Sequence, residues 1–315
     1  MRAVVTGAAG FVGSHLCEEL LAAGDEVVGI DCFTDFYPAR VKKANVAGIL
    51  SHERFTLHQA DLLTAPLAAL LAGADVVYHL AGQPGVRPSW GSEFADYMHR
   101  NILVTQRLLE ALRDVRVWKL VYASSSSVYG NAECYPTAET VRPQPVSPYG
   151  VTKLAAEHLC ELYRLEHRVP AVSLRLFTVY GPRQRPDMAF SRLVQAALTG
   201  ETFHVYGDGE QTRDFTYVGD VVRAFRTAAE STWTGVANIG GGSRTSMNQV
   251  IRTVSTLVRP VNVVHQAMGR GDVRHTGADT TRAHDAFGYA PQVRLETGLL
   301  RMLEAAEPAP TAAAS

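Results

Sequence analysis

Tyr149 and Lys153 are the two residues whose types and spacing most directly suggest chemistry, in the segment SPYGVTKLAAE. Residues four apart share one face of a helix, so the phenol and the ammonium would lie close together. Free tyrosine has a pKa of about 10 and is a poor base at neutral pH. A neighbouring positive charge favours the phenolate, which would let Tyr149 accept a proton from a sugar or alcohol hydroxyl.

Four consecutive serines, Ser124–Ser127, follow a predicted strand shortly before this pair. A serine hydroxyl placed beside the tyrosine would share the proton that the tyrosine removes. A tyrosine and a lysine four residues apart, taken alone, are as typical of a solvent-exposed helix face as of a catalytic pair. The serine run, found in the right order along the chain, makes the catalytic interpretation much stronger.

A glycine-rich loop, TGAAGFVG at residues 6–13, directly follows a β-branched run and opens a helix. Its glycines allow a tight turn and a close approach of the backbone, and the helix N-terminus offers unpaired N–H groups to a pyrophosphate. Asp31 ends the next predicted strand, where its carboxylate would bind an adenosine ribose and repel a 2′-phosphate. The loop therefore predicts a bound NAD rather than NADP.

These residues need a sheet to position them, and the chain alternates strands with helices over its first 180 residues. The pattern predicts strands at 2–6, 26–30, 55–58, 75–79, 118–123 and 171–176, and helices at 11–23, 65–71, 93–112 and 148–167. Such alternation is typical of parallel strands joined by right-handed crossovers. We expect an α/β fold, a Rossmann-type doubly wound parallel sheet with a smaller C-terminal α/β substrate-binding lobe.

The chain divides by pattern near residue 181, where Gly, Pro and Arg become denser and the helices shorter. We expect an NAD-binding domain at 1–180, to which later segments return, a substrate lobe at 181–304, and a disordered Ala/Pro-rich tail at 305–315. In open α/β sheets, ligands bind outside the carboxyl ends of the strands, so the lobe should face that edge.

The bulk composition of the 315 residues is that of an ordinary globular protein, with a formal net charge of −1. That charge gives no general electrostatic reason to bind nucleic acid or an acidic membrane. The four cysteines show neither metal-site spacing nor a pairing pattern, so we expect free thiols and no metal. With no signal peptide and no apolar run of membrane-spanning length, the sequence predicts a cytoplasmic protein.

The motifs TGAAGFVGSHL, HLAGQPGVR, ASSSSVYG, SPYGVTK and RDFTYVGDVV together resemble the extended short-chain dehydrogenase/reductase family over nearly the whole chain. The resemblance implies that Tyr149 is the base, that Lys153 is its electrostatic partner and a ligand of the nicotinamide ribose, and that a serine hydroxyl assists. Ser125 and Ser127 both match the family's active hydroxyls, and the sequence does not decide between them. The cofactor residues expected from position and resemblance are Gly7, Gly10, Phe11, Val12, Gly13, Asp31, Asp61, Leu62, Leu80, Ala81, Gln83, Asn101, Tyr149 and Lys153.

Family members that modify nucleotide sugars keep NAD bound and begin by oxidising C4 of the sugar. The family's 4,6-dehydratases resemble one another in an Asp-Glu pair after the fifth strand, and its UDP-glucuronate decarboxylases in a Glu just before VYG. This chain has only serines there, which favours 4-epimerisation. The segments FTVYGPRQRPDMA and GIDCFTDFYPARVKK are similar to those of UDP-glucuronate 4-epimerases, although Cys32 replaces their usual Asn.

A uronate substrate gives an arginine a specific task. Oxidation at C4 makes a β-keto acid, which loses CO2 when its carboxylate aligns with the carbonyl π system. A bidentate arginine can hold the carboxylate out of that alignment. We expect Arg185 to bind it, with Arg87 as a second candidate for the anionic end. The resemblance further implies Tyr206, Arg213, Arg270 and Asp272 as ligands of UDP, with Thr178 and Ser127 also at the substrate.

Several alternatives stay open at this stage. They are a 4-epimerase for UDP-glucose or UDP-galactose, a UDP-glucuronate decarboxylase, and an NAD-sensing module without turnover. The resemblance also implies a homodimer. Leu103, Leu108, Leu109, Leu159 and Leu162 are candidates for its apolar helix faces, but packing on the sheet would use similar residues.

Overall fold

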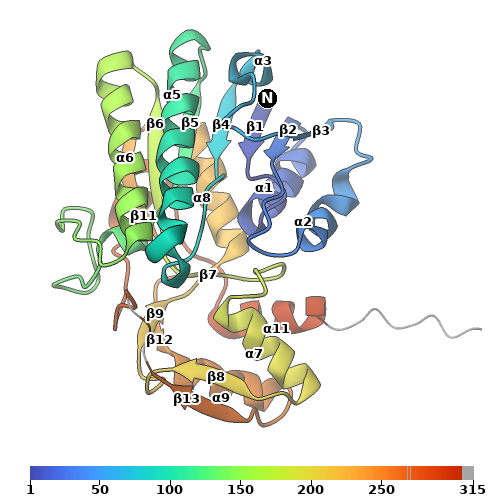
Figure 1. Ribbon diagram of the computed structural model, residues 1–315, viewed down its shortest axis with the longest axis vertical. Helices are drawn as coiled ribbons and strands as arrows, with labels where there is room; N and C mark the ends of the chain where they lie inside the picture. The colour runs from blue at the N-terminus through green and yellow to red at the C-terminus, as the bar shows by residue number, and fades with distance from the viewer. Residues whose placement is uncertain (268, 270, 307–315) are drawn as a thin grey trace, which may run out of the picture.

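A seven-stranded parallel sheet forms the centre of the molecule in the computed structural model, which describes residues 1–267, 269 and 271–306 (Figure 1). The strand order is β11-β6-β5-β4-β1-β2-β3. The direction in which successive strands are added to the sheet reverses between β1 and β4. This reversal creates the crevice where open α/β sheets bind ligands. The strands are β1 Arg2–Thr6, β2 Glu26–Asp31, β3 Phe55–Gln59, β4 Val76–His79, β5 Lys119–Ser125, β6 Ala171–Leu176 and β11 Gly235–Ile239.

Helices cover both faces of this sheet, as the predicted doubly wound fold requires. One face packs against α1 Phe11–Ala22, α8 Val218–Glu230 and α10 Thr281–Phe287. The other packs against α3 Leu67–Leu71, α5 Val104–Asp114 and α6 Pro148–His167. Successive residues of a strand point to opposite faces of the sheet. Val5 thus packs in the hydrophobic core on the α1 side and Val4 in the core on the α5 side. The Rossmann-type prediction is confirmed.

The helix predicted at 93–112 is interrupted. It begins as a short helix, α4 Phe94–Tyr97, passes through the π-helical segment η4 Met98–Leu103 and continues as α5. π-Helical turns are rare and are often found beside functional sites. This one lies beside the cavity described below, toward which Arg100 projects.

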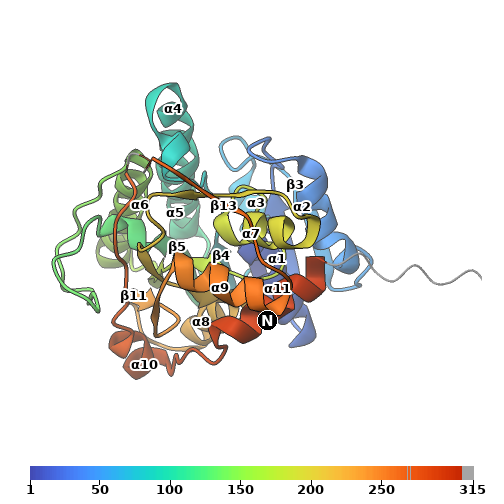
Figure 2. The ribbon, with the colours of Figure 1, turned by 90° about the horizontal axis from the view of Figure 1, so that it is seen from below.

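The C-terminal lobe has its own apolar core, formed by α7 Ala189–Thr199, α9 Met247–Leu257, α11 Leu295–Ala306 and the parallel pair β8 Phe203–Tyr206 and β13 Val263–Gln266. Figures 1 and 2 show it beneath the carboxyl ends of the main sheet. The remaining elements are α2 Ala39–Val46, the pair β7 Val179–Tyr180 and β10 Thr216–Tyr217, the pair β9 Thr212–Asp214 and β12 Arg244–Ser246, and the 3-10 turns η1 Ala47–Ile49, η2 Arg87–Ser89, η3 Gly91–Glu93 and η5 Ser126–Val128.

Segments beyond residue 180 serve both parts, because β11, α8 and α10 pack into the main sheet while α7, α9 and α11 build the lobe. Helix α11 runs to Ala306, so the first two residues of the predicted tail are helical, and 307–315 lie outside the described residues. No helix in the described part of the chain is both long and apolar enough to cross a membrane.

Candidate active site

A cavity of about 480 Å³ opens at the carboxyl ends of β1, β2, β4 and β5. The glycine loop, the end of β2, the segment after β4, the serine run and the start of α6 contribute to its wall. It therefore gathers the cofactor motif and the Tyr149-Lys153 pair, which are about 140 residues apart in the sequence, into one space.

The glycine loop has a shape that only glycine permits at two positions. Gly7 has a φ of +72°, in the left-handed region. A Cβ atom on Gly13 would lie 2.1 Å from the carbonyl oxygen of Gly7. Helix α1 then begins at Phe11 with no side chain capping it, which leaves its first N–H groups available to an anion. This geometry fits the pyrophosphate of a dinucleotide.

Asp31 stands at the end of β2 and lines the cavity, as predicted. Its carboxylate also organises the surrounding loops: Oδ2 accepts a hydrogen bond from Ala9 N at 3.1 Å and Oδ1 one from Phe33 N at 2.8 Å. These bonds fix the acid at the position where an adenosine ribose would present its hydroxyls.

Every predicted cofactor residue except Asn101 lines this cavity. Asn101 is buried behind the wall, where its Oδ1 accepts a bond from Gln83 N at 2.7 Å and its Nδ2 donates to Gln83 O at 3.1 Å. It thus supports a cofactor-side residue from behind. Gly82 is needed next to it, since a Cβ there would lie 2.8 Å from Asn101 Oδ1.

Several lining residues were missed by the sequence reasoning, notably Cys32, Thr34, Lys42 and Arg100. Lys42 is buried and donates to the carbonyl oxygen of Thr34 at 2.9 Å and to its hydroxyl at 2.8 Å. The segment after Asp31 that resembles other epimerases contains three of them. Arg100 gave no signal, because its projection depends on the π-helical turn.

Tyr149 lies in the cavity wall at the first turn of α6, whose N-cap Ser147 accepts a bond from Gly150 N at 3.1 Å. Burial raises the pKa of Tyr149, while a hydrogen bond with Ser125 and the positive charge of Arg185 lower it. Burial and two side chains from other segments, Ser125 and Arg185, therefore determine how readily this phenol loses its proton.

The serine run divides by function. Ser124 Oγ donates to Glu157 at 2.7 Å inside the protein, whereas Ser125 lies beside the Tyr149 phenol and lowers its pKa. Ser125 Oγ also accepts from Ser127 N at 3.1 Å, and Ser127 lines the cavity. Of the two hydroxyls that the sequence left open, Ser125 is the one beside the candidate base.

Lys153 is only 6% exposed, and its ammonium donates to the carbonyl oxygen of Ala123 at 2.8 Å. Burial lowers its pKa to about 8. Its Nζ also lies near Gly82, since a Cβ atom on that glycine would be 3.5 Å from it. The lysine thus brings a positive charge to the strand ends without bonding the phenol.

Thr178 and Arg185 complete the wall on the side of the C-terminal lobe. Arg185 donates from Nε to Asp187 Oδ1 at 3.0 Å and from Nη2 to Asp187 Oδ2 at 2.8 Å. Its guanidinium carbon also lies 5.5 Å from the centre of the Phe36 ring. One edge of the guanidinium is therefore occupied by the Asp187 carboxylate, in the two-bond geometry that arginine forms with carboxylates.

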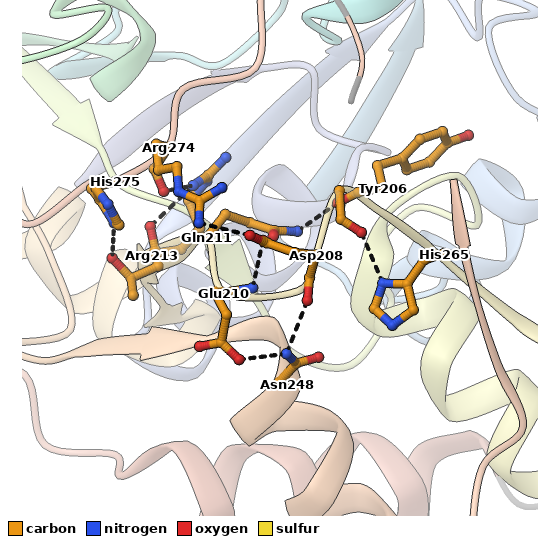
Figure 3. A network of polar contacts seen from close by, with 11 residues as sticks. Tyr206, Asp208, Glu210, Gln211, Arg213, Asn248, His265, Arg274 and His275 are labelled. Atoms are coloured by element: carbon orange, nitrogen blue, oxygen red, sulfur yellow. Dashed lines mark hydrogen bonds and ion pairs between the residues drawn. The ribbon is translucent and has the colours of Figure 1, made fainter. Parts of the chain in front are cut away.

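The residues predicted to bind UDP form a separate group outside this cavity lining. Arg87, predicted as a second candidate for the anionic end of the substrate, is absent from the cavity lining and joins this group: it pairs with Asp272 at 2.7 Å, and its guanidinium carbon lies 3.6 Å from the centre of the Tyr206 ring. Arg213 donates to the carbonyl oxygens of Val273 and Arg274 at 2.6 and 3.2 Å, within the polar network of Figure 3. Arg270 lies outside the described residues.

Comparison with known proteins agrees with this arrangement. Residues 3–240 match the model of the NAD dependent epimerase/dehydratase family. A Bacillus subtilis relative, "Uncharacterized UDP-glucose epimerase YtcB", is 44% identical over 95% of this chain and 96% of its own. A UDP-glucuronate 4-epimerase of Thermodesulfobacterium geofontis is 33% identical, over 95% of this chain and 94% of the relative.

A solved structure is similarly close. The UDP-glucuronic acid 4-epimerase of Bacillus cereus, solved with UDP-glucuronic acid and NAD, superposes with a TM-score of 0.94 at 43% identity. The match covers 97% of this chain and 98% of that one. With a full-length fold match, a family-model match over most of the chain and the nucleotide geometry of the glycine loop, this protein belongs to the NAD dependent epimerase/dehydratase family.

Proposed function

We propose that this chain is an NAD-dependent 4-epimerase that interconverts UDP-glucuronate and UDP-galacturonate. The observation that carries the proposal is the meeting of Tyr149, Ser125 and Arg185 in one cavity wall, below the glycine loop. Similarity to the Bacillus cereus and Thermodesulfobacterium enzymes supports the choice of substrate.

In this reaction Tyr149 accepts the proton of the sugar 4-OH, and the neighbouring Ser125 hydroxyl helps to stabilise the phenolate. Bound NAD supplies the acceptor, and afterwards the donor, of the C4 hydride. Arg185 places positive charge near the phenol and favours its ionised form, while Lys153 is held at Ala123 O. Tyr149 then returns the proton to the product.

The cavity is poorly equipped for elimination of water from the sugar. Among its described lining residues only Asp31 and Asp61 carry carboxylates, and they follow β2 and β3 at the adenosine end. No acid–base carboxylate pair therefore flanks Tyr149 there. Proton and hydride movement at C4 remains the chemistry that these side chains support.

Arg185 suits a uronate because its fork already makes two parallel hydrogen bonds to the Asp187 carboxylate. We infer that the sugar C6 carboxylate takes up or shares this position, beside Thr178. Bidentate binding fixes the carboxylate plane and so opposes loss of CO2 from the 4-keto intermediate. The UDP group would reach the Arg87, Tyr206, Arg213 and Asp272 group, with Arg87 moving off the Tyr206 ring to admit uracil.

The test is product analysis with UDP-glucuronate and the NAD-loaded protein. UDP-galacturonate without a UDP-pentose supports the proposal, while a UDP-pentose as the main product would replace it with decarboxylation. The similarity to a protein named as a UDP-glucose epimerase makes UDP-glucose the second candidate substrate. Faster epimerisation of UDP-glucose than of the uronate would overturn the role given to Arg185.

We also propose that the protein forms a homodimer through the exposed side of α6 and of the η4–α5 helix. Leu103 and Leu162, two of the five leucines considered, are exposed there. Leu108 and Leu109 are fully buried against the sheet, and Leu159 packs on the same core. Leu108 and Leu109 therefore belong to the fold and not to an interface, whereas Leu159 is only partly buried.

A further inference from the structure

We propose that Arg183 is a positioning residue, which docks the loop 181–188 on α1 and α2 and thereby sets the place of Arg185. The inference rests on the proposed role of Arg185 at the sugar carboxylate. It assigns the uronate preference partly to a residue that is absent from the cavity wall.

The backbone of Arg183 has a φ of 62°, in the left-handed region that residues with a Cβ atom rarely adopt. A non-glycine residue persists there only where its surroundings hold it. The turn lies between Gly181 and Arg185, so its conformation determines the direction in which the loop enters the cavity wall.

Hydrogen bonds of the Arg183 side chain keep the turn in this conformation. Nη1 donates to Glu18 Oε1 at 3.0 Å and to the carbonyl oxygen of Asn45 at 2.9 Å. Nη2 donates to the other oxygen of Glu18 and to His15 Nδ1, the latter at 3.0 Å. One guanidinium therefore binds two helices of the NAD-binding part from a loop that leads into the C-terminal lobe.

His15 adds a second attachment to the same loop. Because its Nδ1 faces a guanidinium, this nitrogen must accept, which leaves Nε2 to carry the proton and donate to the carbonyl oxygen of Pro182 at 2.9 Å. Two consecutive loop residues, Pro182 and Arg183, are thus held by one side chain of α1.

The residues that bind Arg183 also contact the glycine loop, through Asn45. Asn45, whose carbonyl oxygen receives Arg183, donates from Nδ2 to the carbonyl oxygen of Ala9 at 3.0 Å. The sugar-side loop and the glycine loop are therefore braced against a common residue of α2. This arrangement fixes the distance between the cofactor and whatever Arg185 binds.

Arg185 itself depends on this support. Within the described chain it donates hydrogen bonds only to Asp187, which belongs to the same loop. The Phe36 ring, 5.5 Å from the guanidinium carbon, is the weaker contact, so the guanidinium largely follows the loop backbone. Misplacement of a binding group by about 1 Å can cost about 100-fold in rate, so a loosened loop should affect recognition of the carboxylate specifically.

The experiment compares Kd values for UDP-glucuronate and UDP-glucose on the NAD-loaded protein, together with kcat and KM for the uronate. Arg183→Gly is the main variant, because glycine accepts a φ of 62° and so removes the side chain without straining the turn. We expect its preference for the uronate to fall by about 10-fold or more, with the UDP-glucose Kd changed less than about 3-fold. KM for the uronate should rise and kcat should fall, because Arg185 also lowers the pKa of Tyr149. Glu18→Gln should give a smaller loss of the same kind.

Arg226→Ala is the matched control, since Arg226 bonds the neighbouring Glu19 of α1 at 3.0 Å from α8 and not from the loop. It should keep the full preference. If Arg185→Ala leaves the preference intact, the proposed role of Arg185 fails and the inference with it. If Arg185→Ala removes the preference while Arg183→Gly and Glu18→Gln retain it, the role of Arg185 stands and the positioning role of Arg183 is refuted. The positioning role is refuted as well if Arg226→Ala removes the preference.

Discussion

The Tyr149 phenol is subject to opposing influences that only the folded chain brings together. Burial raises its pKa, and Ser125 and Arg185 lower it. The four-residue spacing predicted Lys153 as the balancing charge, but helix spacing cannot show that its ammonium is held by the Ala123 carbonyl. Nor could it show that an arginine from residue 185 faces the same phenol. Distances between side chains on different elements are not encoded in local periodicity.

Tyr149→Phe should lower kcat for epimerisation by about 100-fold to 10,000-fold, because it removes the group that accepts the 4-OH proton. Binding of NAD, followed by fluorescence titration, should change little. Tyr97→Phe is the matched control: its ring lies 6.3 Å from that of Tyr149, and its hydroxyl donates to Pro84 O. Loss of turnover in both variants alike would show that packing, and not proton transfer, is being measured.

Lys153 should make the cofactor-free protein less stable than it would be with an apolar residue at this position. Burial lowers the folded-state pKa to about 8, against an ordinary value of 10.5. Below pH 8 the lysine is charged in both states, and the folded state bears the full cost of burying that charge. Between pH 8 and 10.5 the unfolded chain binds more protons, so the wild type gains stability as pH rises.

Lys153→Met should therefore be more stable than the wild type at pH 7, by about 1–2 kcal/mol once the lost bond to Ala123 O is counted. The difference in free energy of unfolding should move by about 3 kcal/mol in favour of the wild type between pH 8 and 10.5. Urea unfolding of the cofactor-free proteins across this range measures it. A difference independent of pH would contradict the lowered pKa.

Helix α6 carries Tyr149 and Lys153, and a buried ion pair connects it to two strands. Glu157 accepts from Arg175 of β6 at 2.5 and 3.0 Å and from Ser124 of β5 at 2.7 Å. Arg175 also donates to Tyr129 at 2.7 Å. This network sets the distance between the catalytic turn of α6 and the serine run.

Glu157→Gln should lower the free energy of unfolding by about 3–5 kcal/mol, because Arg175 is left buried without a counter-charge. The double variant Glu157→Met with Arg175→Met should recover much of this loss, since it buries no charge. Chemical denaturation of the two variants and the wild type tests the point. Equal destabilisation in both would mean that packing of α6, and not the ion pair, is decisive.

At the level of elements, apolar periodicity and turn residues predicted six of the seven strands of the main sheet. β1, α6 and β6 have the predicted ends, because each is a strongly patterned run with a clear boundary residue. The π-helical break at Met98–Leu103 has no such signal, since its apolar spacing is that of an ordinary helix. Strand β11 joins the sheet from residue 235, and a short strand returning over such a sequence distance cannot be placed by local pattern.

At the level of the whole molecule, the sequence predicted the cofactor side of the site better than the sugar-nucleotide side. The glycine loop and Asp31 lie at the ends of adjacent strands, so topology alone brings them together. Arg87, Tyr206 and Asp272 come from two parts of the chain that meet only when the lobe packs against the sheet. Their contact, and the loop brace at Arg183, are products of tertiary packing.

The apolar surface left on the single chain leads to a prediction for the assembled molecule. Val151, Leu162 and Leu165 of α6 are 47%, 52% and 61% exposed, and their separations of about three and four turns place them on one face. Exposed apolar residues in a row on one helix are typical of an interface between subunits. We expect light scattering coupled to gel filtration to give the mass of two chains.

Leu162→Glu combined with Leu165→Glu should shift that mass to one chain at micromolar concentration, because two carboxylates cannot be buried unpaired at the centre of an interface. Leu257→Glu with Val264→Glu is the matched control. It changes two other exposed apolar residues, 37% and 46% exposed, which lie in the C-terminal lobe, and should leave the dimer intact. A wild type that elutes as one chain, or a dimer that survives the α6 substitutions, would place the interface elsewhere or remove it. Because α6 also carries Tyr149 and Lys153, we expect the separated chains to lose stability together with activity, and NAD to restore part of the stability by mass action.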